Sequence, residues 1–183
     1  MVREKHTDSP SDRDDPLAAH DGRAFPSEAV LGPDEVREII MAEHKSLRRR
    51  IGRLESEATR LLACSVPSAE TRQVTRGLAL RLCAAMAAHA ELENRILIPL
   101  LAGADAWGPV RAERLAAEHD QQALLLQAYA DMLGSEDMTA QALAVTAWRL
   151  VRALREDMET EEAGVLDAGL FSPDAVNPDV ETG

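Results

Sequence analysis

Apolar residues recur every three or four positions along four long stretches of this chain. This spacing places them on one face of an α-helix, and it differs from the strict alternation that is typical of a β-strand. We predict helices over residues 34–62, 68–102, 109–133 and 139–167. Helices of similar length that are joined by short loops pack antiparallel to their neighbours. The pattern therefore predicts an all-α fold, an up-down-up-down four-helix bundle.

The predicted helices begin at residues that often start helices. We expect Asp34 to cap the first helix and Ser68 the second, because both side chains can accept hydrogen bonds from free backbone N–H groups. Pro109 suits the first turn of the third helix, after a loop over residues 103–108. The expected core positions are Ile40, Leu47, Ile51, Leu54, Ala58 and Leu61, then Leu78, Leu82, Ala85 and Ile96, then Leu115, Ala123, Leu126, Ala130 and Leu133, and finally Leu143, Ala147, Leu150 and Leu154.

Each apolar face is interrupted by residue types that bind metals. The interrupting residues are His44 in the first helix, His89 and Glu93 in the second, His119 in the third, and Asp157 and Glu161 in the fourth. Carboxylates inside a core are costly unless they are paired or bound to a metal. A single histidine at such a position is more often a hydrogen-bonded core residue, so the metal interpretation depends on the whole set. An alternative makes Asp157 and Glu161 surface acids on a frayed end of the fourth helix.

Residue counts along the helices place these residues at one level of the bundle. His44 and His119 each lie ten residues into their helices, whereas His89 and Asp157 lie thirteen and ten residues before the ends of theirs. The starts of the first and third helices share one end of such a bundle with the ends of the second and fourth. At about 1.5 Å per residue, all four residues fall roughly 15–20 Å from that end. Glu93 and Glu161 follow four residues later on the same faces.

Three imidazoles and three carboxylates that converge at one level can hold two divalent metal ions, with the glutamates bridging them. Mixed nitrogen and oxygen ligation with room for a small ligand suits iron, or manganese as an alternative, better than a closed zinc site. The cations would also keep the acids ionised inside the core.

The segments that carry these residues resemble the hemerythrin-like (HHE cation-binding) domains over about residues 36–168. That family has a histidine on its first helix, His-x-x-x-Glu on the second, a histidine on the third and His-x-x-x-Glu on the fourth. The matching segments are AEHKSLRRRIGRLE, HAELENRILIPLL, AEHDQQALLL and DMETEEAGVLD, the last with Asp157 where the family has histidine. The metal ligands that the resemblance implies are His44, His89 and His119 as terminal nitrogen ligands, Glu93 and Glu161 as bridges, and Asp157 as a terminal carboxylate.

The resemblance implies a buried non-haem centre of two iron ions, joined by an oxo or hydroxo bridge, that binds or reacts with O2, peroxide or NO. Its role would be the handling or sensing of oxygen or iron. Hemerythrins that carry O2 reversibly use five histidines and two carboxylates, whereas three of each are predicted here. This difference keeps two alternatives open, a diiron oxidase or peroxidase and a metal-poor regulatory bundle. Asp157 also leaves open a mononuclear centre, and Glu162 is an alternative ligand to Glu161.

Composition narrows the functional classes further. The 183 residues include 32 acids against 20 Lys and Arg, giving a net charge of -12, and aromatic residues make up 3%. This composition argues against nucleic-acid binding, which requires a basic surface. The chain has no phosphate-binding glycine loop, no membrane-length apolar run and no signal-peptide pattern, so we expect a cytoplasmic protein. The acidic, proline-rich residues 1–33 and 169–183 are predicted disordered tails around a domain at 34–168.

Two further groups of residues have simple expected roles. Cys64 ends the first helix and Cys83 lies fifteen residues into the second, roughly 20 Å away along the axis, so we predict two reduced thiols. The basic residues Lys45, Arg48, Arg49, Arg50 and Arg53 are expected on the solvated face of the first helix.

Overall fold

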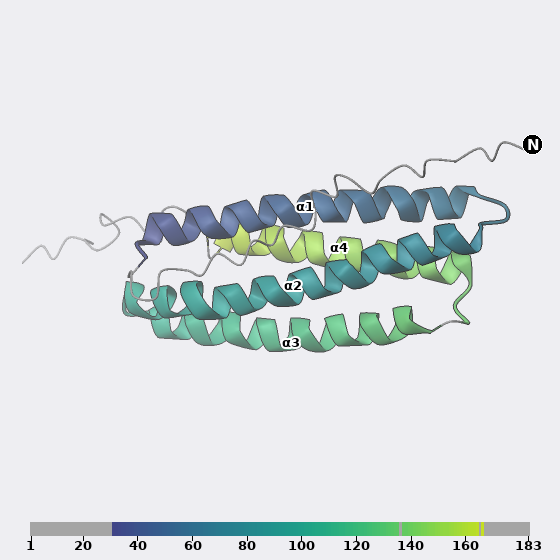
Figure 1. The fold of residues 1–183 in the computed structure, drawn as a ribbon. Helices are drawn as coiled ribbons and strands as arrows, with labels where there is room; N and C mark the ends of the chain where they lie inside the picture. Colours follow the sequence, from purple (N-terminus) through teal and green to yellow (C-terminus); the bar gives the residue numbers. More distant parts are fainter. Residues whose placement is uncertain (1–30, 136, 165, 167–183) are drawn as a thin grey trace, which may run out of the picture. The chain divides into compact units, whose positions relative to one another are not determined.

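The computed structural model describes residues 31–135, 137–164 and 166, and these form four helices (Figure 1). The helices are α1 (Pro33–Ala63), α2 (Ala69–Ala104), α3 (Gly108–Gly134) and α4 (Ala140–Gly164). The described part of the chain contains no strand, which confirms the predicted all-α four-helix bundle. The predicted tails fall almost entirely outside the described residues, and none of the described helices is long and apolar enough to cross a membrane.

The helix ends differ from the prediction by a few residues. Ser68 caps α2 as expected, because its hydroxyl accepts a hydrogen bond from the Thr71 N–H at 3.1 Å. The predicted cap of α1 was wrong. Pro33 already has a backbone that suits the first turn, so Gly32 is the N-cap instead of Asp34. The predicted loop over 103–108 was too long, because α2 continues to Ala104 and α3 begins at Gly108.

The turn between α2 and α3 is so tight that it requires glycine at position 108. A Cβ added to Gly108 would overlap the backbone carbonyl oxygen of Leu101, which cannot move without distorting α2. We expect Gly108→Ala to lower the free energy of unfolding by about 1–3 kcal/mol. Gly103→Ala is the matched control, since a Cβ there has open space and alanine favours the helix. Urea denaturation of both variants checks the prediction, and equal stabilities would contradict it.

The core consists of two apolar clusters. The large cluster lies towards the α1–α2 loop and includes Leu47, Ile51, Leu54, Leu82, Met86, Leu126, Leu133, Leu143, Leu150 and Leu154. The small cluster lies towards the α2–α3 turn and consists of Val36, Ile40, Leu97, Leu101, Ala112, Leu115 and Leu166. Between the two lies a layer of buried polar side chains, which we call the polar layer. It contains His44, His89, Glu93, His119, Gln122 and Glu161.

The predicted core positions are buried throughout α1 and α4, but α2 and α3 are rotated slightly from the prediction. In α2 the predicted Leu82 is buried and so are the unpredicted Ala79, Cys83 and Leu97, while Leu78, Ala85 and Ile96 are only half-buried. In α3 the predicted leucines are buried, but so are the unpredicted Gln122 and Tyr129, and the predicted Ala123 is exposed. Both helices are rich in alanine and leucine on more than one face, so the apolar period leaves their rotation ambiguous. Both cysteines are free thiols, as predicted, with Cys64 exposed and Cys83 buried.

Candidate metal centre

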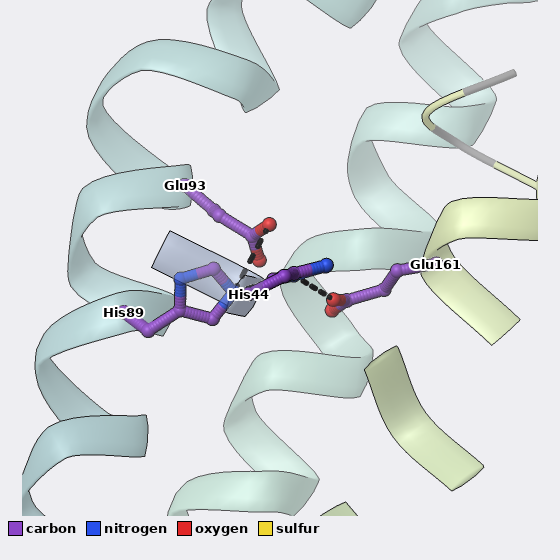
Figure 2. A group of neighbouring side chains, drawn as sticks. All are labelled: His44, His89, Glu93 and Glu161. Atoms are coloured by element: carbon purple, nitrogen blue, oxygen red, sulfur yellow. Dashed lines mark hydrogen bonds and ion pairs between the residues drawn. The ribbon is translucent and has the colours of Figure 1, made fainter. Parts of the chain in front are cut away.

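Four buried side chains in the polar layer point toward one another (Figure 2). His44 comes from α1, His89 and Glu93 from successive turns of α2, and Glu161 from α4. One ligand atom from each of the four lies within 4.8 Å of all the others. The Nε2 atoms of His44 and His89 are 3.0 Å apart. His89 Nε2 lies 3.4 Å from Glu93 Oε1, and His44 Nε2 lies 3.3 Å from Glu161 Oε2.

His119 of α3 faces the same two glutamates from another side. Its Nε2 lies 3.1 Å from Glu93 Oε2 and 3.8 Å from Glu161 Oε1. Each glutamate therefore presents one oxygen toward the pair His44 and His89 and its other oxygen toward His119. Two carboxylates that each face two sets of nitrogen ligands have the arrangement that bridging ligands need. The residue counts had predicted this convergence at one level.

Asp157 lies at the edge of the polar layer, outside the group whose ligand atoms converge. It is half-buried on α4, and its carboxylate accepts a hydrogen bond from the Gln122 side-chain amide across the α3–α4 contact. Burial, together with the nearby carboxylates Glu161 and Glu93, raises the pKa of Asp157 to about 6. The ligand role of Asp157 therefore stays a prediction, and the contact with Gln122 is its observed interaction.

Glu161 and Glu162 contact different ring nitrogens of His44, and this difference shows which glutamate faces the candidate centre. Glu161 is buried and faces Nε2, whereas Glu162 accepts a hydrogen bond from Nδ1 at 2.7 Å on the opposite edge of the ring. The alternative that the acids of α4 are surface residues on a frayed end is wrong for Glu161, which is 6% exposed within the helix. Glu161 is therefore the glutamate that faces the centre.

Hydrogen bonds around the centre fix the orientation of two histidines. A carboxylate only accepts, so Glu162 places the proton of neutral His44 on Nδ1 and leaves the Nε2 lone pair facing inward. His119 Nδ1 donates in the same way to Asn94 Oδ1 at 2.6 Å. Arg48 pairs with Glu162 at 2.8 Å and lowers the pKa of that carboxyl group. Histidines in metal sites are commonly oriented by such outer partners.

The sequence pattern does not predict these outer partners. It offers Glu162 only as an alternative ligand and places Arg48 on the solvated face of its helix. It predicts no role for Asn94 or Gln122. Their positions do carry a weak signal, because Arg48 follows His44 by four residues and Gln122 follows His119 by three, so each lies on the neighbouring turn.

The two buried carboxylates and the imidazoles of the centre shift one another's pKa values. Burial raises the pKa of Glu93, and the nearby Glu161 adds to this effect. Burial and the neighbouring His44 lower the pKa of His89 to about 4, so this imidazole is neutral at pH 7. Burial opposes protonation of His119, but its hydrogen bonds to Glu161 and Glu93 outweigh that effect and raise its pKa to about 9.

The hydrogen bonds of the buried glutamates indicate whether the centre fits a metal ion. Glu93 Oε1 and Glu161 Oε2 are buried and accept no hydrogen bond from the protein. Buried oxygens of this kind are rare in folded proteins because each costs about 1–3 kcal/mol. A metal ion bound between the imidazole Nε2 atoms and these oxygens would satisfy both of them. The donor set therefore fits a divalent cation.

The comparisons with known proteins agree with this chemistry. A family model described as the hemerythrin HHE cation binding domain matches residues 35–168, a range that contains all four helices except the first two residues of α1. A search of curated proteins found no match, and neither did a search of solved structures.

Proposed function

The chain belongs to the hemerythrin HHE cation-binding family, and from this premise we propose that it binds or reacts with O2, peroxide or NO at a buried dinuclear iron centre. The observation that carries the proposal is the placement of Glu93 and Glu161 between two sets of imidazole nitrogens. Bridging carboxylates bring two metal ions close enough to act together on one small ligand. The proposed role in the cell is the handling or sensing of oxygen or iron.

In this function the protein would hold the metal-binding side chains in place and keep bulk water away from them. His44 and His89 would bind one metal ion, His119 and Asp157 the other, and the two glutamates would bridge them. Iron, with manganese as the alternative, would supply reversible ligand binding and electron transfer. The apolar clusters on both sides of the polar layer limit the access of water to the buried donors, whose exposed fractions are 0% for His44 and 3% for His89.

A second candidate function is that of a diiron oxidase or peroxidase. The proposed ligand set has as many carboxylates as histidines, and an oxygen-rich, anionic set favours ferric iron over the reversible O2 binding of a carrier. Asp157 also borders a solvent-facing pocket, through which an oxidant can approach. Turnover of peroxide or of an organic substrate distinguishes this enzyme from a binder.

Iron analysis of the purified protein tests the proposal. We expect two iron ions per chain after expression in iron-supplemented medium, together with the near-ultraviolet absorption of a bridged ferric pair. NO or O2 added to the reduced protein should change that spectrum. Glu91→Gln is the matched control for Glu93→Gln, because Glu91 is on the same helix but exposed. Metal-free wild-type protein, or equal iron contents in the two variants, would overturn the proposal.

A further inference from the structure

A pocket of ≈ 360 Å³ opens to solvent between α3 and α4, beside the polar layer. We call it the α3–α4 groove. Glu118 lines its outer part, Ala153 lines the α4 side, and Gln122 and Asp157 lie at its inner end. Gln122 follows His119 by three residues on α3 and Asp157 precedes Glu161 by four on α4, so the inner end of the groove lies one helical turn from two residues of the candidate metal centre.

The inner end of the groove carries an oxygen atom that no described group satisfies. Gln122 is only 9% exposed, and its amide nitrogen donates a hydrogen bond to Asp157. Its Oε1 atom is buried and has no hydrogen-bond partner. An amide oxygen beside a carboxylate is a pair of ligands that hard divalent cations accept. A cation at the inner end of the groove would contact the Asp157 carboxylate, and the Gln122 oxygen would join it once the amide gives up its hydrogen bond to Asp157 and turns over.

The charges along the groove favour the entry of cations. Glu118 is a largely exposed acid near the mouth, and its ion pair with Arg114 at 2.8 Å involves two solvent-exposed side chains, so water weakens it. Asp157 lines the groove beside the buried Gln122, and Glu161 lies one helical turn from Asp157 on α4. A cleft lined by charges of one sign raises the local concentration of ions of the opposite sign.

Described residues cover several other sides of the centre. His44 and His89 are buried, and the ion pair between Glu162 and Arg48 lies over the outer edge of the His44 ring. Asn94 contacts the outer nitrogen of His119. The large and small apolar clusters close the polar layer along the bundle axis.

We infer that the divalent metal ion enters the bundle through the α3–α4 groove, attracted by Glu118 at its mouth and first contacted at its inner end by Gln122 and Asp157, of which Asp157 remains a proposed ligand of the loaded centre. The inference rests on the proposed function, because it assumes that the centre binds metal. It assigns Gln122 and Glu118 a role in loading the centre, which is separate from any reaction there.

The rate of metal uptake by the metal-free protein tests this inference. Co2+ is mixed with the protein in a stopped-flow instrument, and the visible absorption of the bound ion reports loading. We expect Ala153→Phe, which fills the groove, to slow loading by about tenfold or more while the final stoichiometry stays that of the wild type. Ala87→Phe is the control, because Ala87 is exposed on α2, away from the groove. Equal loading rates for these two variants would overturn the inference.

A charge reversal at the mouth provides a second test that leaves the packing intact. We expect Glu118→Lys to slow loading by roughly three- to tenfold at low ionic strength, with a smaller difference at high salt. Glu113→Lys is the control, since Glu113 is also exposed on α3 but does not line the groove. A salt-independent rate, or the same slowing in both variants, would count against the groove as the route.

The proposed metal centre and the proposed entry route would be contradicted by different results. If the wild-type protein takes up no Co2+ or Fe2+ at equilibrium, the proposed metal centre is wrong and the entry route is wrong with it. If the wild type loads fully and the groove variants load equally fast, the entry route alone is wrong. Circular dichroism of each variant before mixing confirms that its helices are intact.

Discussion

Saturation with a divalent metal is expected to raise the free energy of unfolding by about 4 kcal/mol when the free metal exceeds its dissociation constant about a thousandfold. The folded chain holds the two glutamates and three histidines together, whereas the unfolded chain has no such site. In the metal-free protein, Glu93 and Glu161 repel each other and keep buried oxygens without hydrogen bonds. The bound cation removes both costs.

The measurement is the thermal unfolding midpoint with Fe2+ under anaerobic conditions, compared with the same protein in a chelator. For a protein of this size, the expected gain corresponds to an increase of roughly 8–16 °C. Glu93→Gln should abolish the increase, while Glu91→Gln, on the exposed face of α2, should keep it. An unfolding midpoint that does not respond to metal would contradict the prediction.

Truncation of Glu162 is expected to weaken metal binding by about 10–100-fold, although this residue does not face the centre. Glu162 accepts the Nδ1–H of His44 at 2.7 Å and thereby holds the imidazole in the tautomer that directs Nε2 inward. Glu162→Ala leaves that nitrogen without its partner. Glu162→Gln retains an accepting oxygen but loses the charge, so we expect an intermediate effect.

Competition between the protein and a calibrated chelator measures the affinity of each variant. Glu159→Gln is the matched control, because Glu159 is exposed one turn away on the same helix. A purely structural role for Glu162 would lower the unfolding temperature of the metal-free protein without changing the affinity at a temperature where both variants are folded. The opposite pattern, loss of affinity with an unchanged metal-free midpoint, supports the orienting role.

The fold and the inner part of the centre could be predicted because both depend on position along the helices. In α1, every predicted core residue from Ile40 to Leu61 is buried. His44 and Glu161 stood out because histidine and glutamate at apolar positions are costly without a specific partner. The rise per residue along each helix then predicts, from residue counts alone, that they lie at one level of the bundle.

The remaining features depend on contacts between helices that a residue pattern does not encode. Asn94 and Glu162 each directly follow a residue of the polar layer, so in the sequence they look like ordinary surface residues. Their roles arise from the side-chain conformations that bring them to His119 and His44. The hydrogen bond between Gln122 and Asp157 depends on how α3 is rotated about its own axis. The sequence does not define that rotation, because α3 carries alanine on more than one face.

The polar layer has a consequence for how the four helices are aligned along their axes. Leucine and alanine fill most of both apolar clusters, so the apolar side chains by themselves distinguish only weakly between this alignment and one shifted by two turns. The same slide would move His44 or Glu161 opposite leucines and leave an ionised or polar group without partners. The residues that are proposed to bind metal thus also select one axial alignment among several that hydrophobic packing alone would permit.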